Sequence, residues 1–375
     1  MADVYSNAYL TIAATRASHS RFSDEEGSFE LIFNYDDRTS FPGSMETVTH
    51  QPLRVHKGEP LLERVWCFQE RVLATRTLHF ASDQMYWECA HCFESEEGMV
   101  NVREEDFYRE YSMEKIANGL RNVAGIEDPT RRRDAWFLLI EEYTSRDMTY
   151  QSDKLPALSG IISALQNLTG DTCYAGIWKS WFMKGLLWRL QSPEWDLYVF
   201  TPKQPFKLDF YRAPSWSFAS IEGVALYNEV DYVDAGNFCA QLEDCSVAPK
   251  GNNPLGELKS GFARIIGPVT SIVSVDHKVS RSGRACKVLL RDQRPVAASV
   301  YFDFDPYDSC QILMITPHTG IAITPVGTEK DTFVRVGAVS VGRVWDDVEL
   351  SRASERRGRY LTALAFPPPT SITLL

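Results

Sequence analysis

The chain has 375 residues, with 39 Lys and Arg against 50 Asp and Glu, a net charge of −11 and a sequence pI near 5.2. An aromatic content of 12% with nine Trp excludes intrinsic disorder, because these side chains supply ample surface to bury. The acidic balance argues against a general nucleic-acid binder, and no apolar run approaches the ~18–20 residues that span a bilayer.

The N-terminal residues and the cysteines indicate the cellular compartment of the protein. Residues 1–20 lack a basic start followed by a long apolar segment, so no secretory signal peptide is expected. The eight cysteines are sparse and irregularly spaced, which is typical of reduced thiols. We therefore predict a soluble cytoplasmic protein with no membrane span and no nucleic-acid partner.

The length is too great for one hydrophobic core, because cores stop growing at about 250–300 residues. We expect three regions, which are residues 1–100, residues 101–200 and residues 201–375. Within the first region, the unbroken apolar run at residues 10–14 predicts a strand that is covered on both faces.

A helix and two strands are predicted after the loop-rich residues 20–60. Apolar side chains recur with a helical spacing, which indicates a helix over residues 61–73. Strand-forming residues then predict strands at residues 77–80 and 85–89, joined by a turn at residues 81–84.

Residues 103–200 are predicted to be mostly helical. One helix has its apolar face at Trp136, Leu139, Ile140 and Tyr143. The next carries apolar residues at helical spacing from residue 155 to residue 165 and ends near Gly170, a plausible C-cap. Residues 178–195 are dense in Trp, Leu and Phe, so we expect them to pack between the units.

From residue 205 onward, short strands alternate with clusters of Gly, Pro and Asp. This alternation of short strands and turn residues predicts an antiparallel sandwich or barrel. The expected strands are residues 263–266, 271–275, 287–290, 298–302, 311–315, 321–323 and 332–341. The Pro-rich tail at residues 365–375 is expected to be a strap or a loose end.

Several segments, in the same order, resemble the fungal heterokaryon-incompatibility family, called HET. Residues 4–14 (VYSNAYLTIAA) are similar to the family motif "iYxnAxLTIaA". Residues 64–80 (RVWCFQERVLATRTLHF), followed by WEC at residues 87–89, resemble "RxWxxQErlLxxRxlxF…WEC". Residues 150–160 (YQSDKLPALSG) are similar to "TxxsDkLpAlsGiA", and residues 212–220 (RAPSWSFAS) resemble "yxAPSWSWAS".

The opening elements of the family have no counterpart here. HET proteins normally begin with "LSYxWG", "lPxTIxDAi" and "YlWIDslCIiQ", none of which is present, so we expect this chain to begin in the latter half of the domain. The resemblance implies a partial TIR-like α/β layer. The expected fold class is then α+β, with that layer, a helical middle region and a β-rich antiparallel C-terminal domain.

The resemblance implies an effector of fungal non-self recognition and programmed cell death, switched on by self-assembly or by a protein partner. One alternative is a TIR-like NAD glycohydrolase, because HET domains resemble TIR domains and some of these cleave NAD. Another is an interaction or accessory protein recruited to a different fungal pathway such as secondary metabolism, since function belongs to sites rather than folds.

Glu70 is the catalytic candidate of the enzymatic alternative. It ends the segment WCFQE, which resembles the "sxWCxxE" pattern of NAD-cleaving TIR domains. A carboxylate there could stabilise the ribosyl cation that forms when the nicotinamide–ribose bond of NAD breaks. Trp66 and Arg71 are the candidate substrate-binding residues, with Trp66 walling the pocket by stacking.

A purely structural interpretation of the same residues stays open. Glu70 could pair with Arg64, Arg71 or Arg76 and only orient the helix, while Trp66 belongs to the core.

Other chemistry-bearing residues point to no metal and no cofactor. Cys89 and Cys92 have CxxC spacing, but structural zinc needs four ligands and a redox CxxC opens a helix, so reduced thiols are predicted. The basic runs at residues 131–133 and 352–359 are expected to be solvated surface. No GxGxxG, GxxxxGK[ST], HExxH or GxSxG motif is present.

Overall fold

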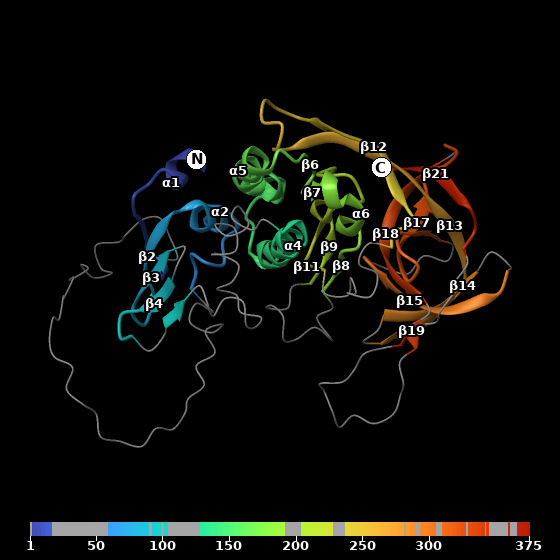
Figure 1. Ribbon diagram of the computed structural model, residues 1–375, viewed down its shortest axis with the longest axis horizontal. Helices are drawn as coiled ribbons and strands as arrows, with labels where there is room; N and C mark the ends of the chain where they lie inside the picture. The colour runs from blue at the N-terminus through green and yellow to red at the C-terminus, as the bar shows by residue number, and fades with distance from the viewer. Residues whose placement is uncertain are drawn as a thin grey trace, which may run out of the picture.

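The fold consists of three neighbouring parts, which Figure 1 shows side by side. The computed structural model describes residues 2–16, 59–89, 92–98, 101–103, 128–191, 204–227, 237–280, 283–289, 293–304, 310–327, 329–341, 343–344, 359–360 and 366–375. A small N-terminal sheet, a helical centre and a β-rich antiparallel C-terminal part follow one another along the chain. The mixed α and β content and the antiparallel C-terminal sheet confirm the expected fold at that level.

The N-terminal sheet is mixed, with strand order β1-β2-β3-β4-β5. Strands β1 and β2 are parallel, and the remaining neighbours are antiparallel. The turn predicted at residues 81–84 is present, because the Ala81 amide donates to the Gln84 carbonyl. The elements in chain order are α1 (Ala2–Ser6), β1 (Thr11–Ala13), α2 (Val65–Leu73), β2 (Arg76–Phe80), β3 (Met85–Cys89), β4 (Cys92–Ser95) and β5 (Asn101–Arg103).

The expectation that the apolar run at residues 10–14 is covered on both faces is wrong. Strand β1 is the edge of its sheet, and the Ile12 side chain is 67% exposed. An apolar run indicates a strand but does not count the neighbours that cover it, and β1 is hydrogen-bonded only to β2 among the described strands.

The helical centre forms as the apolar spacing predicts. Helix α4 (Pro129–Ser145) starts at the N-cap Asp128, whose side chain accepts from the Thr130 amide. Helix α5 (Ser159–Thr169) ends at Gly170, which has a left-handed φ of 68° and is therefore the predicted C-cap. Residues 151–158 form two short 3-10 helices (Gln151–Lys154 and Pro156–Leu158) instead of the first turns of α5.

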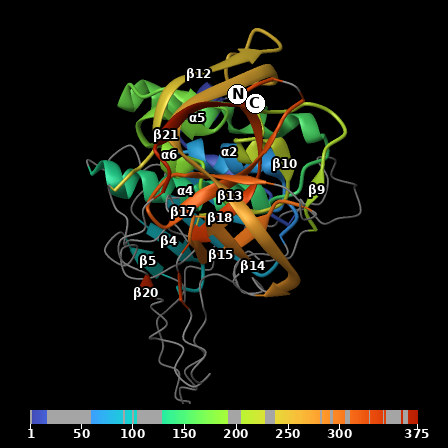
Figure 2. The ribbon, with the colours of Figure 1, turned by 90° about the vertical axis from the view of Figure 1, so that its right-hand side faces the viewer.

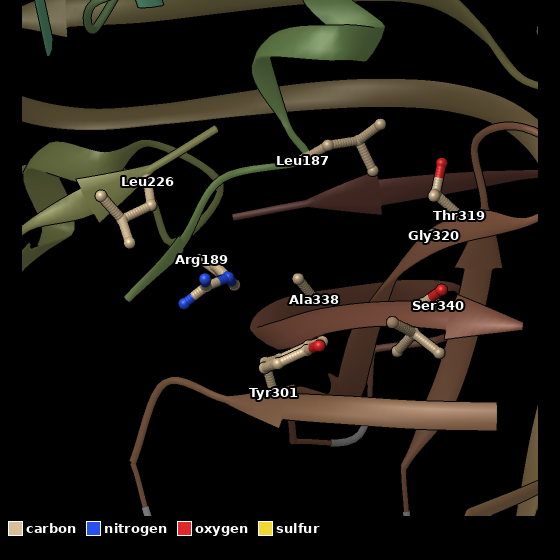
Figure 3. Close-up of a pocket in the computed structure, with 9 residues that line it drawn as sticks. Leu187, Arg189, Leu226, Tyr301, Thr319, Gly320, Ala338 and Ser340 are labelled. Atoms are coloured by element: carbon tan, nitrogen blue, oxygen red, sulfur yellow. The ribbon is translucent and has the colours of Figure 1, made fainter. Parts of the chain in front are cut away.

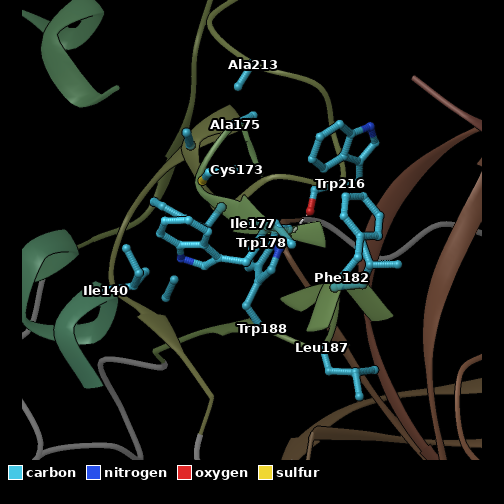
Figure 4. Close-up of a cluster of buried hydrophobic side chains, with 14 of the residues drawn as sticks. Ile140, Cys173, Ala175, Ile177, Trp178, Phe182, Leu187, Trp188, Ala213 and Trp216 are labelled. Atoms are coloured by element: carbon cyan, nitrogen blue, oxygen red, sulfur yellow. Dashed lines mark hydrogen bonds between the residues drawn. The ribbon is translucent and has the colours of Figure 1, made fainter. Parts of the chain in front are cut away.

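The centre is held together by a buried cluster of tryptophans (Figure 4). Trp136 meets Trp178 edge to face with ring centroids 5.3 Å apart, and the Trp188 indole N–H donates to the Trp216 carbonyl at 3.0 Å. Trp178 and Trp188 come from the stretch that was expected to pack between the units; residues 192–195 of that stretch lie outside the described residues.

Short elements complete the centre. Strand β11 pairs with β8, so segments on both sides of residue 200 share one small sheet. These elements are β6 (Cys173–Tyr174), β7 (Ile177–Trp178), α6 (Phe182–Gly185), β8 (Arg189–Leu190), β9 (Phe206–Lys207), β10 (Ile221–Glu222) and β11 (Ala225–Leu226). No helix of the described residues is long and apolar enough to cross a membrane.

The C-terminal part is an antiparallel sheet that closes on itself. The strand order β13-β14-β15-β18-β17-β16 returns to β13, because β13 also pairs with β16. Figure 2 looks onto this part of the molecule. The strands are β12 (Gln241–Pro249), β13 (Leu258–Ser280), β14 (Gly283–Leu289), β15 (Pro295–Phe302), β16 (Gln311–Met314), β17 (Thr319–Pro325), β18 (Thr332–Val341) and β21 (Pro369–Leu374), with a separate short pair β19 (Arg343–Val344) and β20 (Arg359–Tyr360).

One expectation for this part needs correction, and one alternative is decided. The strands predicted at residues 263–266 and 271–275 are one strand, β13, which continues through Gly267 and Pro268. Around Pro268, β13 changes partners: its first half pairs with β12 and β21, and its second half pairs with β14. Of the two alternatives for the C-terminal tail, a strap or a loose end, the structure agrees with the strap, because β21 pairs with both β13 and β18.

Candidate functional site

Helix α2 carries the three predicted site residues and is fixed by its apolar face. Val65, Phe68 and Val72 are buried in the main hydrophobic core. The guanidinium of Arg146, from the end of α4, lies 4.6 Å from the Phe68 ring centroid and donates to the Leu62 carbonyl. The helix therefore cannot rotate without exposing its core residues and breaking these contacts.

The three predicted site residues contact three different elements. The Trp66 indole N–H donates to Asp153 Oδ2 at 2.8 Å, and the Arg71 guanidinium pairs with Glu88 on β3 at 2.9 Å. The Tyr5 side chain of α1 hydrogen-bonds to Glu70. Trp66 and Glu70 lie one turn apart on the same helix, as expected, but their side chains have separate partners.

Glu70 has an unusual electrostatic environment for a helix carboxylate. Burial raises its pKa, and the hydrogen bond from Tyr5 and the charge of Arg64 only partly oppose this rise. Burial and the neighbouring Glu70 carboxylate also raise the pKa of Tyr5 to about 12. Glu70 is half-buried rather than fully exposed, and such a perturbed carboxyl is a candidate for chemistry.

Beneath α2, a buried polar network joins the helix to the sheet. Glu88 Oε2 accepts from Arg71 Nε at 2.9 Å and lies 2.7 Å from His79 Nε2, while His79 Nδ1 lies 3.3 Å from Thr15 Oγ1. Burial alone would raise the pKa of Glu88, but the Arg71 charge and the His79 contacts lower it well below its usual range. Glu88 is thus an anchor for the helix that carries Glu70.

The order Thr15–His79–Glu88 matches a nucleophile–base–carboxylate series, but it cannot act on a substrate. Thr15, His79 and Glu88 are all buried. A catalytic nucleophile must be reached by its substrate, so we assign this network a structural role. The sequence held a signal for it: His79 and Glu88 stand at inward positions of β2 and β3, where polar residues need partners.

Three of the segments that resemble HET motifs, residues 64–73, 150–160 and 212–220, meet at one junction. Asp153 accepts from Trp66 of α2, and the Gly160 amide donates to Gln69 Oε1 at 2.7 Å. These bonds join residues 64–73 to residues 150–160, which lie far apart in the sequence.

Residues 212–220 join the same junction through Arg212, which belongs to a buried cluster of charges. Glu222 Oε2 lies 3.3 Å from Lys154 Nζ and 3.1 Å from an Arg212 guanidinium nitrogen. Arg212 also donates to the carbonyls of Gln151, Ala219 and Ile221. Burial lowers the pKa of Arg212, and the Glu222 carboxylate opposes this effect. Sequence reasoning missed Glu222, because no spacing rule links it to its partners.

A small cavity lies between the centre and the C-terminal sheet (Figure 3). It has a volume of about 30 Å³ and is lined by Arg189, Tyr301, Thr319 and Ser340 among others. The Arg189 guanidinium lies 5.3 Å from the Tyr301 ring centroid. A second, apolar cavity beside Cys173 measures about 10 Å³. Each has room for only one or a few water molecules, and neither is lined by Trp66, Glu70 or Arg71.

The remaining sequence features have plain structural settings. Arg131 is exposed on α4 near Asp128, and Arg133 pairs with Asp134 at 2.7 Å. The basic run at residues 352–359 lies outside the described residues except for Arg359. In the described part of the chain, no group of three or more His, Cys, Asp or Glu is placed to hold a metal ion.

Comparison of the chain with protein-family models, with curated proteins and with solved structures gives no significant match. A functional assignment therefore depends on the residues and geometry of this chain.

Proposed function

We propose that this chain is an effector of the HET type, which acts in fungal non-self recognition and triggered cell death by self-assembly. The observation that carries the proposal is a set of exposed apolar side chains within residues 4–12, on α1 and beside the edge strand β1. This N-terminal edge consists of Val4, Tyr9, Leu10 and Ile12, which are 69%, 82%, 39% and 67% exposed.

The junction between the motif segments supports the family part of the proposal. Residues 64–73, 150–160 and 212–220 are tied together by Trp66–Asp153, Gln69–Gly160 and the Lys154–Glu222–Arg212 cluster, in which Glu222 lies two residues beyond the last segment. Residues that resemble a family pattern and also hold one another in place are under a common structural constraint. The parallel pair β1–β2, with α2 between them in the chain, is likewise compatible with a partial TIR-like layer.

The position of β1 supports the self-assembly part of the proposal. A strand at the edge of a sheet presents unpaired backbone groups that can template pairing with another strand. Clustered exposed apolar side chains on a soluble protein mark interaction sites. A second copy of this chain fits such an edge, because an isologous contact brings the same apolar patch from each copy together.

We expect Ile12→Lys to abolish self-association of the purified chain, because the contact would bury a charge from each copy. Sedimentation velocity over a concentration series measures this directly. Val273→Lys is the matched control, since Val273 is 56% exposed on β13, away from the edge. A chain that stays monomeric at every concentration, or that associates equally well as Ile12→Lys, would contradict the role of the edge.

A second candidate function is NAD hydrolysis by Glu70. It is favoured by the raised pKa of this half-buried carboxyl and by Trp66 one helical turn away. The separate partners of Trp66, Glu70 and Arg71 argue against a shared nucleotide pocket on this face of α2.

We therefore expect the purified chain to release nicotinamide from NAD no faster than its Glu70→Gln variant. Electrostatic catalysis requires preorganised groups around the developing cation. Trp66, Glu70 and Arg71 instead contact Asp153, Tyr5 and Glu88, which belong to three different elements. A time course of nicotinamide release at saturating NAD decides the matter. Robust turnover that is lost in Glu70→Gln would make the enzyme the better assignment.

A further inference from the structure

Two of the eight cysteines face each other at one end of the first sheet. Strand β3 ends at Cys89 and β4 begins at Cys92, and the antiparallel register pairs Glu88 with Phe93. The next pair in that register is Cys89 with Cys92, and their Sγ atoms are 3.6 Å apart. All eight cysteines lie in the described residues, and none forms a disulfide.

We propose that Cys89 and Cys92 are a redox modification site, which forms a reversible intramolecular disulfide by exchange with a small disulfide such as oxidised glutathione. The backbone spacing suits this bond. Directly opposed residues of an antiparallel pair have Cα atoms about 4.5–5.5 Å apart, within the range of about 4.4–6.8 Å that disulfides span. The two sulfur atoms need to approach by about 1.5 Å to reach bonding distance, which side-chain rotation can supply.

The other thiols are poor competitors for the same oxidant. Cys67, Cys173, Cys245, Cys286 and Cys310 are buried, and burial raises the pKa of each, so they stay protonated at neutral pH. The thiolate is the attacking species in exchange, and access to it is also required. Cys89 and Cys92 are half-buried and so can be reached.

The disulfide between Cys89 and Cys92 forms in two exchange steps. One cysteine thiolate attacks a sulfur of glutathione disulfide, which breaks the S–S bond, releases one glutathione thiolate and leaves a mixed disulfide on the protein. The second cysteine loses its proton, and its thiolate attacks the protein sulfur of the mixed disulfide and releases the second glutathione. The two cysteines are oxidised by two electrons in total, and glutathione disulfide is reduced to two glutathione molecules.

Cys239 provides an internal comparison, because it is also half-buried but lies outside the described strands, so no antiparallel register sets a second cysteine opposite it. Its thiol donates to the Met314 carbonyl at 3.5 Å. It can form a mixed disulfide with glutathione, and we expect this adduct to persist because no cysteine stands opposite Cys239 in the register of the described strands. The proposal therefore predicts different oxidation products at the two places.

The test is a titration of the folded, full-length chain with oxidised glutathione, quenched by alkylation and digested with trypsin. The tryptic peptide of residues 77–103 contains Cys89 and Cys92 and no other cysteine. We expect this peptide to carry neither alkyl groups nor glutathione, to be two hydrogens lighter than the dithiol form, and to regain both thiols on reduction. Cys92→Ser should instead trap glutathione on Cys89.

Two results would overturn the proposal. One is a wild-type peptide that stays fully alkylated while Cys239 takes up glutathione. The other is a wild-type peptide that accumulates stable glutathione adducts without the internal disulfide. Because both are read on the wild-type chain, a folding defect of Cys92→Ser leaves the test intact.

Discussion

Glu222→Gln is expected to lower the free energy of unfolding by about 3–5 kcal/mol, the usual cost of removing one partner from a buried ion pair. Glu222 is the carboxylate that Lys154 and Arg212 share, and all three side chains are buried. The substitution keeps the shape of the side chain but removes the negative charge between two buried cations. Urea denaturation at neutral pH measures the loss.

The matched control is Glu257→Gln. Glu257 pairs with Lys250 at 2.9 Å, but both side chains are largely exposed, so the expected cost is below about 1 kcal/mol. Equal losses in the two variants would show that the cluster does not hold the junction between the motif segments.

Glu88→Gln is expected to destabilise the protein strongly at pH 7 and progressively less in acid. The folded state lowers the pKa of Glu88 well below the usual value of about 4.3, through Arg71 from α2 and His79 from β2. A carboxylate of this kind contributes stability above its unfolded pKa and loses it as the pH falls toward the folded pKa. The difference between wild type and variant should therefore be about 3–5 kcal/mol at pH 7 and shrink below about pH 4.

Unfolding curves in urea at pH 7, 5, 4 and 3 test this expectation, with Glu257→Gln, which removes a carboxylate from an exposed ion pair, as the control. If the difference in the free energy of unfolding between wild type and Glu88→Gln stays constant across this range, the ionised form of Glu88 does not stabilise the protein.

Local sequence patterns predicted the helices well, because the spacing of apolar residues is set by the helix itself. Val65, Phe68 and Val72 are buried on α2, and Gly170 ends α5 in the left-handed conformation. The prediction of two separate strands on either side of Gly267 and Pro268 was wrong, because a strand depends on its partner strands and not on its own sequence alone. Pairing with β21, about 100 residues further along the chain, carries β13 through both residues.

The candidate site was only partly predictable. Trp66 and Glu70 lie on one helix as their spacing indicates, but the partners that orient them, Asp153 and Tyr5, come from distant segments. Glu222 became visible only when the fold brought its partners together, and the inward position of His79 on its strand did not identify Glu88 and Thr15 as its partners. Sequence spacing reports neighbours within one element, whereas the electrostatics of a site depend on contacts between elements.

The most direct test of the proposed function is the viability of fungal cells that express the chain from an inducible promoter. Wild type and Glu70→Gln should both trigger cell death, while Ile12→Lys should leave cells viable at equal protein levels, and Val273→Lys should behave as wild type. Cell death that is lost in Glu70→Gln but kept in Ile12→Lys would contradict self-assembly and favour the enzyme. Full viability with the wild-type chain would contradict the effector function itself.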